Sequence, residues 1–316
     1  MYFGGGTPSL LTLSQLEKLM TQVDNTFRLS DMEEITLEAN PDDLSIDYIK
    51  GLKEFGINRL SIGIQSFEDS YLTTLARRHS VRQAQDAVFQ AHNIGFNNIS
   101  IDLMFALPQM TIAQWENTLA KSLLLPINHI SAYLLSQEPN TALNTMVGKG
   151  LLTLPNEDNA LAQFDFTEDF LKKAGFIHYE TSSYCLQGYH SRHNSNYWNR
   201  VPYLGIGASA HSFDGSQRQW NVSSIEDYIS KPLNETLQAE TLTSQQQYEE
   251  YIMLSLRTIE GINTLTIQSE FPQFYNSFLR KSNIQLSQGL LERLGENLAL
   301  SRKGHHLLNQ IIVSLF

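Results

Sequence analysis

Cysteine is nearly absent from this sequence, since Cys185 is the only one among 316 residues. A single cysteine excludes an internal disulfide, and it excludes an iron–sulfur or zinc site built from several thiolates of this chain. Such a content fits a reducing, cytoplasmic setting. No apolar run approaches the ~18 to 20 residues that a membrane helix needs. The start, Met1-Tyr2-Phe3-Gly4, has no basic segment followed by an apolar one, so neither a transmembrane segment nor a secretion signal is expected.

Positive charge is also scarce. Lys and Arg total 22 against 33 Asp and Glu, which gives a formal net charge of -11. Such a protein would repel a phosphate backbone unless a local basic patch intervened, and Arg192, Arg200 and Arg218 are too dispersed to form one. The sequence therefore predicts no nucleic-acid partner. Its length and ordinary hydrophobic content are typical of one large domain with a smaller appendage.

The first two thirds of the chain alternate short β-rich runs with longer helical patterns, which indicates an α/β fold with a parallel sheet. The predicted strands are Ile35–Ala39, Arg59–Gln65, Asn98–Leu103 and His129–Leu135. Helix starts are marked by a Ser or Thr followed three residues later by Gln. These pairs are Thr12 with Gln15, Ser80 with Gln83, and Thr111 with Gln114. Gly56 and Gly95 then occupy positions where helices end.

A polar side chain recurs near the end of each predicted strand. After Thr7 come Glu38, Gln65, Asp102 and Ser136, at intervals of about 30 residues, the size of one strand-helix unit in a (β/α) barrel. In a barrel, such positions form the rim where active sites are assembled, so the row predicts a polar ligand across the barrel mouth. A single polar strand end is more often a cap or turn residue.

An open Rossmann-like sheet is an alternative at this point. Its G-x-G-x-x-G fingerprint is absent, however, and Gly4-Gly5-Gly6-Thr7-Pro8 is a different turn. Consecutive glycines allow the backbone to approach a ligand closely, because no Cβ intervenes. On its own, a Gly-rich turn that ends in Pro is often no more than a turn.

Several segments, in this order and spacing, resemble the HemN/HemW branch of the radical S-adenosylmethionine (SAM) proteins. They are residues 2–11 (YFGGGTPSLL), 38–41 (EANP), 61–67 (SIGIQSF), 101–104 (IDLM) with 107–108 (LP), and 138–141 (EPNT). The resemblance implies a partial, TIM-like (β/α) barrel with an extension over residues 1–220, lacking its first strand-helix unit. A connector over 221–243 and a small, mostly helical, winged-helix-like C-terminal domain over 244–316 would follow.

In that family, SAM is held at the barrel rim, and the resemblance carries these roles to matching positions. The backbone of Gly5, Gly6 and Thr7 would hold the amino-acid end of the cofactor, Glu38 would be a ligand-binding glutamate, Gln65 and Asp102 would lie near the ribose, and Ser136 would be a later rim contact. By spacing, Arg77 would pair with the cofactor carboxylate. The alternative is a solvated arginine on a helix face, since Arg78 is its neighbour.

Residues 192–198 (RHNSNYW) resemble the His-Asn-x-x-Tyr-Trp signature of HemW, followed by a matching YLGIG at 203–207. HemW proteins are thought to bind heme and to pass it to acceptor proteins such as respiratory enzymes. The resemblance implies heme contact at His193, Tyr197 and Trp198, with His193 as a possible iron ligand and His211, His178 and Tyr179 as secondary candidates. A lone histidine beside aromatic residues is more often packed and hydrogen-bonded.

Two further functions stay open. The first is an oxygen-independent coproporphyrinogen III oxidase of the same radical-SAM branch, and the second is an unrelated barrel enzyme with Glu38 and Asp102 as acid and base. The family's Cys-x3-Cys-x2-Cys loop, which carries a [4Fe-4S] cluster, does not occur in this sequence. We therefore expect an N-terminally truncated chain that is inert in radical chemistry by itself. A homodimer is a further possibility.

Overall fold

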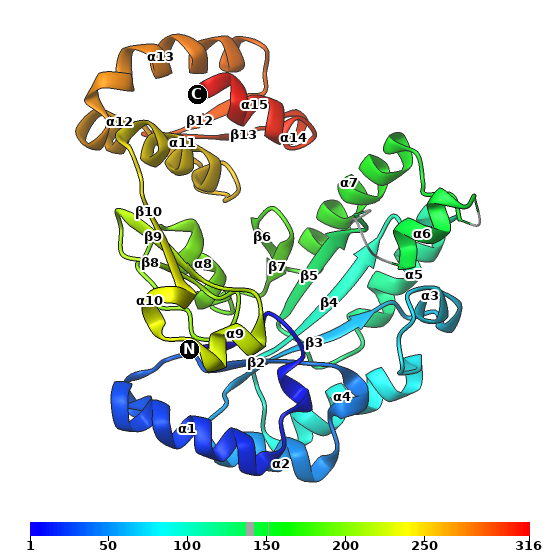
Figure 1. The fold of residues 1–316 in the computed structure, drawn as a ribbon. Helices are drawn as coiled ribbons and strands as arrows, with labels where there is room; N and C mark the ends of the chain where they lie inside the picture. The colour runs from blue at the N-terminus through cyan, green and yellow to red at the C-terminus, as the bar shows by residue number, and fades with distance from the viewer. Residues whose placement is uncertain (137–141, 151) are drawn as a thin grey trace. The chain divides into compact units, whose positions relative to one another are not determined.

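The computed structural model describes residues 1–136, 142–150 and 152–316, which form two compact units, 1–190 and 191–316 (Figure 1). Each unit has its own apolar core: one gathers residues between Leu16 and Tyr184, and the other gathers residues between Tyr248 and Leu315. The domain boundaries expected from the sequence, at 220 and 243, stay predictions. The motif at 138–141 lies outside the described residues.

The first unit is built on a seven-stranded sheet in the order β1-β2-β3-β4-β5-β7-β6. Its strands are β1 (Tyr2–Phe3), β2 (Thr36–Ala39), β3 (Arg59–Gln65), β4 (Ile99–Phe105), β5 (His129–Leu134), β6 (Ile177–Glu180) and β7 (Ser183–Cys185). Neighbours from β1 to β5 are parallel, whereas β7 is antiparallel to both β5 and β6. The α/β fold with a partial barrel is therefore confirmed. The sequence did not predict β7, so it missed this antiparallel hairpin.

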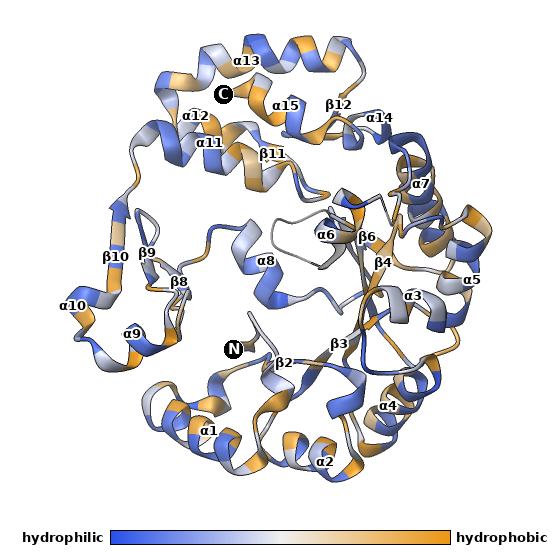
Figure 2. Cartoon of the chain, turned by 45° about the vertical axis from the view of Figure 1, so that its right-hand side comes forward, coloured by the Kyte–Doolittle hydropathy of each residue, from blue (hydrophilic) through white to orange (hydrophobic). Residues whose placement is uncertain are grey.

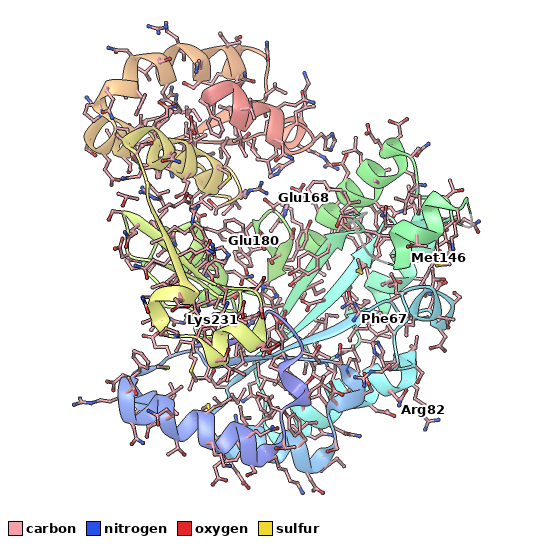
Figure 3. All side chains as sticks on the ribbon, viewed as in Figure 1. Phe67, Arg82, Met146, Glu168, Glu180 and Lys231 are labelled. Atoms are coloured by element: carbon pink, nitrogen blue, oxygen red, sulfur yellow. The ribbon has the colours of Figure 1, made fainter. Side chains whose placement is uncertain are left out.

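Helices follow the strands, as the alternating pattern predicted. They are α1 (Leu13–Phe27), α2 (Ile46–Glu54), α3 (Asp69–Thr74), α4 (Val81–Ile94), α5 (Ile112–Ser122), α6 (Ala142–Gly148) and α7 (Glu157–Lys173), with 3-10 turns η1 (Pro8–Leu10), η2 (Leu29–Asp31) and η3 (Pro41–Asp43). All three predicted capping boxes of this unit are formed. Hydrophilic and hydrophobic residues alternate along α1 and α2 (Figure 2), as expected for helices with one buried face. Arg82 projects outward from α4, while Phe67 after β3 is buried (Figure 3).

In the second unit, α8 (Arg192–Trp198) precedes an antiparallel sheet of β8 (His211–Phe213), β9 (Gln217–Asn221) and β10 (Leu237–Thr241). Two short helices, α9 (Ile225–Ser230) and α10 (Leu233–Thr236), lie between β9 and β10 in sequence. The polar segment 221–243 thus contains regular structure, and β10 pairs along its full length with β9. The residues of β10 are mostly exposed, so they lack the apolar alternation that would have revealed a strand.

The C-terminal part of this unit has the element order of a winged helix, as predicted. It contains α11 (Ser244–Ser255), β11 (Ile262–Asn263), α12 (Thr264–Glu270), α13 (Pro272–Ser287), β12 (Leu291–Leu294), β13 (Asn297–Leu300), α14 (Arg302–His305) and α15 (Leu308–Leu315). The helix α11 begins with a capping box of Thr243 and Gln246 and ends at Ser255. Within the described chain, no helix is both long and apolar enough to cross a bilayer.

A buried glutamine fixes the loop that follows β4. Gln163, on α7, accepts a hydrogen bond from the backbone N–H of Ala106 at 2.8 Å and donates to the carbonyl of Met110 at 3.2 Å. Ala106 and Gln109 hold left-handed backbone angles, with φ of 55° and 61°. Since these conformations are unfavourable for residues with a side chain, the loop depends on contacts of this kind.

We therefore predict that Gln163→Leu destabilises the protein. An unsatisfied buried polar group costs about 1 to 3 kcal/mol. The change removes the acceptor of the Ala106 N–H and the donor to the Met110 carbonyl and to Asn159. We expect a loss of about 2 to 4 kcal/mol of unfolding free energy in urea denaturation. Thr118→Val is the matched control, because the buried Thr118 hydroxyl has no hydrogen-bond partner among the described residues. Equal destabilisation by both changes would contradict this role of Gln163.

Candidate functional site

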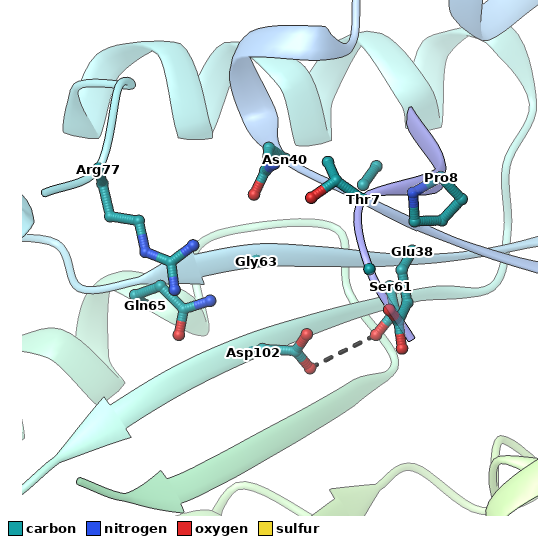
Figure 4. A pocket seen from close by; sticks show the side chains of 11 residues that line it. Thr7, Pro8, Glu38, Asn40, Ser61, Gly63, Gln65, Arg77 and Asp102 are labelled. Atoms are coloured by element: carbon teal, nitrogen blue, oxygen red, sulfur yellow. Dashed lines mark hydrogen bonds between the residues drawn. The ribbon is translucent and has the colours of Figure 1, made fainter. Parts of the chain in front are cut away.

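A pocket of about 200 Å³ opens toward the carboxyl ends of β2, β3 and β4 (Figure 4). Its lining is Gly6, Thr7, Pro8, Glu38, Ala39, Asn40, Ser61, Gly63, Gln65, Arg77 and Asp102. Six of the eight residues predicted for SAM are thus brought together. Gly5 is adjacent in the chain but is not part of the lining. Ser136 lies two residues beyond β5 and is not part of it either.

The glycine-rich turn is fastened to the loop that follows β2. The buried Ser9 hydroxyl donates to the Asp43 carboxylate at 2.6 Å and accepts from the backbone N–H of Asn40 at 3.2 Å. A Cβ at Gly4 would collide with the ring of Tyr2 and the carboxylate of Glu38. Glycine is therefore required at this position, and the turn lies close over the strand ends.

Two carboxylates enter the pocket from neighbouring strands. Glu38 accepts a 2.6 Å hydrogen bond from the hydroxyl of Tyr2, whose pKa is raised by burial and by the charge of Glu38. Burial raises the pKa of Asp102 to about 6, and the charge of Glu38 acts in the same direction. Hydrogen bonds from Ser131 and Ser61 and the charge of Arg59 limit that rise. Tyr2 thus stays a donor, and Asp102 is largely ionised at neutral pH.

Gln65 ends β3 with a left-handed backbone angle, φ 69°, where the register with β4 shifts. A Cβ at Gly63 would lie only 2.9 Å from the amide nitrogen of Gln65. Gly63 therefore leaves the space in which the Gln65 side chain lies across the strand. Left-handed conformations of non-glycine residues cluster at functional sites, where the surrounding structure must hold them in place.

The two adjacent arginines have different surroundings. Arg78 pairs with Asp42 at 2.9 Å and with Asp43 at 3.1 Å. Arg77 lines the pocket beside Gln65 (Figure 4) and, within the described chain, has no carboxylate at ion-pair distance. Partial burial lowers the pKa of Arg77, while the charges of Asp102 and Asp42 oppose that change. Arg77 is therefore the guanidinium that remains available to a ligand in this pocket.

Sequence reasoning missed four polar or turn-forming members of the lining, namely Pro8, Asn40, Ser61 and Gly63. A signal for two of them was present. Residues two apart on a strand point to the same face, so Ser61 and Gly63 share the face of Gln65. Asn40 lies inside a motif already noted, two residues after Glu38, but no pattern assigned it a role.

The second group of predicted residues lies on α8, which begins after Ser191, whose side chain caps the helix. His193 and Tyr197 are one helical turn apart, and their rings meet edge to face at 4.7 Å. Tyr197 in turn contacts the ring of Tyr203 at 4.6 Å. Trp198 buries its indole N–H without an acceptor in the described chain. His193 and Tyr197 thus share a face, and Trp198 makes no ring contact with either among the described residues.

The secondary candidates are divided between the two units. The Tyr179 hydroxyl lies 2.8 Å from Nε2 of buried His129, and Tyr179 itself is 4% exposed. The ring of His178 stacks on Tyr184 at 4.3 Å. Both residues belong to the unit of residues 1–190 and serve its packing. His211 belongs to the other unit, where its ring stacks on Trp220 at 6.1 Å.

Comparison with known proteins agrees with this architecture. The family model of the radical SAM superfamily matches residues 1–121, and that of the HemN C-terminal domain matches residues 242–307. The heme chaperone HemW of Lactococcus lactis is 34% identical over 313 residues, covering 98% of this chain and 83% of that protein. This chain belongs to the HemN/HemW family of radical SAM proteins.

Other members of the HemN/HemW family give the same result. The heme chaperone HemW of Bacillus subtilis is 34% identical, again over 98% of this chain and 83% of that protein. The solved structure of coproporphyrinogen III oxidase (HemN) from Escherichia coli matches with a TM-score of 0.83 at 21% identity, covering 99% of this chain and 76% of that chain. At this identity the structural match supports the fold alone.

Membership of the radical SAM superfamily implies a [4Fe-4S] cluster held by cysteine thiolates, and the donors of this chain do not fit one. Cys185 is buried on β7, and burial raises its pKa to about 12, so that it is a thiol rather than a thiolate. In the part of the chain that the structure describes, no three His, Cys, Asp or Glu side chains are grouped to hold a metal ion.

The raised pKa of Asp102 predicts how an Asp102→Asn variant depends on pH. The pKa of Asp102 in the folded protein, about 6, exceeds the ordinary 3.8. Ionisation of Asp102 therefore leaves the free energy of unfolding of the unchanged protein unaltered below pH 3.8 and lowers it by about 3 kcal/mol above pH 6. We expect the stability of the variant, relative to the unchanged protein, to rise by about 2 kcal/mol between pH 4.5 and pH 8. Urea unfolding at both pH values measures this difference. A difference that does not vary with pH would show that Asp102 is not desolvated.

Proposed function

We propose that this chain is a HemW-type heme chaperone that binds SAM in the pocket above β2, β3 and β4, binds heme against α8, and passes heme to acceptor proteins. The observation that carries the SAM assignment is the convergence of Glu38, Gln65, Arg77 and Asp102 in one pocket. The names of the Lactococcus and Bacillus relatives support the heme assignment. Respiratory enzymes as acceptors, a homodimer and a cytoplasmic location remain predictions.

The charge of the pocket complements SAM. The cofactor carries a sulfonium, an ammonium and a carboxylate, so its net charge at neutral pH is positive. The pocket offers two carboxylates, Glu38 and Asp102, and one guanidinium, Arg77. A planar guanidinium suits a carboxylate, with which it forms two charge-assisted hydrogen bonds. The cofactor carboxylate would therefore lie at Arg77, and the positive groups would lie toward the two acids.

The remaining residues would orient the cofactor. Tyr2 holds the Glu38 carboxylate in place, so that Glu38 accepts from the ammonium group. The exposed backbone of Gly6 and Thr7 would contact the amino-acid end. Gln65 and ionised Asp102 would bind the ribose hydroxyls. The function that we assign to these residues is the binding of SAM and of heme, together with the transfer of heme.

For heme, α8 supplies complementary chemistry. The imidazole of His193 is a common axial ligand of heme iron. Tyr197 stands edge to face against it at 4.7 Å and is 37% exposed, so it offers accessible aromatic surface to a flat macrocycle. These two side chains lie on one face of one helix, which is why the heme assignment rests on them.

The match of residues 242–307 to the HemN C-terminal domain favours a second candidate, an oxygen-independent coproporphyrinogen III oxidase. The two functions are separated by their substrates. An oxidase consumes coproporphyrinogen III, whereas a carrier shifts the Soret band of added heme and releases the heme to an acceptor. Porphyrinogen consumption without heme binding would favour the oxidase.

For the SAM pocket, we predict that Arg77→Gln weakens SAM binding by about tenfold or more, since charge-assisted hydrogen bonds contribute roughly 1.5 to 3 kcal/mol and 1.4 kcal/mol is a factor of ten. Isothermal titration calorimetry measures the affinity. The control is Arg82→Gln, because the side chain of Arg82 on α4 is 90% exposed and does not line the pocket. Equal affinities for the two variants would remove Arg77 from the site.

For heme, we predict that His193→Ala abolishes the Soret shift seen on titration with hemin, or lowers the affinity at least about tenfold, because the iron loses an axial ligand. His92→Ala, which removes an exposed imidazole from α4, is the control and should bind as the unchanged protein does. If His193→Ala keeps both spectrum and affinity, His193 is not the ligand.

A further inference from the structure

A second pocket, of about 100 Å³, lies within the unit of residues 191–316. Its aromatic wall begins at Tyr197 and continues through Tyr203 to Phe213, with ring centroids 4.6 Å and 6.2 Å apart. Arg200 and Arg218 also line it. Because a water molecule occupies about 30 Å³, this volume accommodates a short side arm of a ligand and is too small for a whole macrocycle.

Arg200 is held in an unfavourable conformation. It follows α8 with φ 55°, and the backbone N–H of Val201 bonds back to the carbonyl of Asn196 at 2.9 Å. This is the helix-ending position that glycine usually fills. A non-glycine residue is disfavoured there, and it persists only where the surroundings fix it. The surroundings of Arg200 must therefore hold this conformation.

The side chain of Arg200 is fixed but incompletely bonded. It is 15% exposed, and its guanidinium lies over the rings of Tyr251 at 6.0 Å and Phe271 at 5.7 Å. Its Nε is buried and has no hydrogen-bond partner in the described chain. The ion pair with Glu270 spans 3.6 Å, and Glu270 is 56% exposed, so it contributes little. A buried donor without an acceptor destabilises the protein, and a ligand that supplied an acceptor would remove this cost.

The other arginine of the pocket is already neutralised. Arg218 forms a close ion pair with the mostly buried Glu250 and a longer one, at 3.5 Å, with Glu240. Arg200, in contrast, has no acidic partner among the residues that line the pocket, and its ion pair with Glu270 is long and half-exposed. A ligand group suited to this place is a single carboxylate on a short arm.

We propose that Arg200 binds a propionate of heme or of a related tetrapyrrole, while the macrocycle lies outside the pocket against Tyr197 and His193. Tyr197 connects the two parts, because its ring contacts His193 on α8 and also lines the pocket. Charge-assisted bonds to a buried guanidinium favour the carboxylate over an ester, which cannot pair with it. This inference rests on the proposed heme function and adds to it the group by which the macrocycle is oriented.

The test compares hemin with hemin dimethyl ester, in which both propionates are esterified, by Soret titration of the whole chain. We expect the unchanged protein to bind hemin about tenfold or more tightly than the diester. Arg200→Asn should bring this ratio close to one by weakening hemin binding alone. Asn tolerates a left-handed backbone, so the fold should persist. Arg280→Asn, at an exposed position on α13, is the control and should keep the ratio.

The outcomes distinguish a failure of the propionate site from a failure of the proposed heme function. If neither ligand shifts the Soret band, the heme function fails and the inference with it. If hemin binds but the diester binds equally well, or if Arg200→Asn keeps the ratio, only the propionate site is wrong. Should Arg200→Asn fail to fold, Arg200→Lys keeps the charge but lacks the guanidinium fork. A ratio intermediate between one and that of the unchanged protein then supports the site, and an unaltered ratio overturns it.

Discussion

The withdrawal of two carboxylates from water is the constraint on which the pocket depends. Strands of a parallel sheet are usually apolar on both faces, yet β2, β3 and β4 turn Glu38, Ser61 and Asp102 toward the same pocket. Burial raises the pKa of Asp102 to about 6, so the folded protein holds a charge that its own structure disfavours. Such an arrangement is a cost to stability in the free protein, and a cationic ligand is the partner that would offset it.

The loops around the pocket are tied together by ion pairs and hydrogen bonds outside it. Ser9 bonds to Asp43, and Arg78 pairs with Asp42 and Asp43, so the glycine-rich turn and the segment after β3 meet on the same 3-10 turn. Arg78 and the two aspartates are thus paired with one another, whereas Arg77 lines the pocket without an ion pair in the described chain. The availability of Arg77 is therefore a consequence of how its neighbour is bound.

Much of this arrangement could be predicted from the sequence because it is local. Glu38, Gln65 and Asp102 could be located from the predicted strand ends, the capping boxes and the spacing of polar residues. What failed depends on tertiary contacts or lacks a periodic signal: β7 is too short to show alternation, and β10 is mostly exposed. Ser136 fitted the spacing, but β5 ends at Leu134, so equal spacing did not bring it into the pocket.

The two pockets pose opposite electrostatic problems, and the chain meets them differently. The protein has a net charge of -11, so a negatively charged pocket requires only that a carboxylate such as Asp102 be buried beside a few hydroxyl donors. A surplus positive charge is harder to keep available, because nearby glutamates neutralise it, as Glu250 does for Arg218. Arg200 has only the long, half-exposed ion pair with Glu270, and it lies over Tyr251 and Phe271, whose faces hold a cation in place without cancelling its charge. The residue that ends α8 in a left-handed conformation thus also supplies the guanidinium of this pocket.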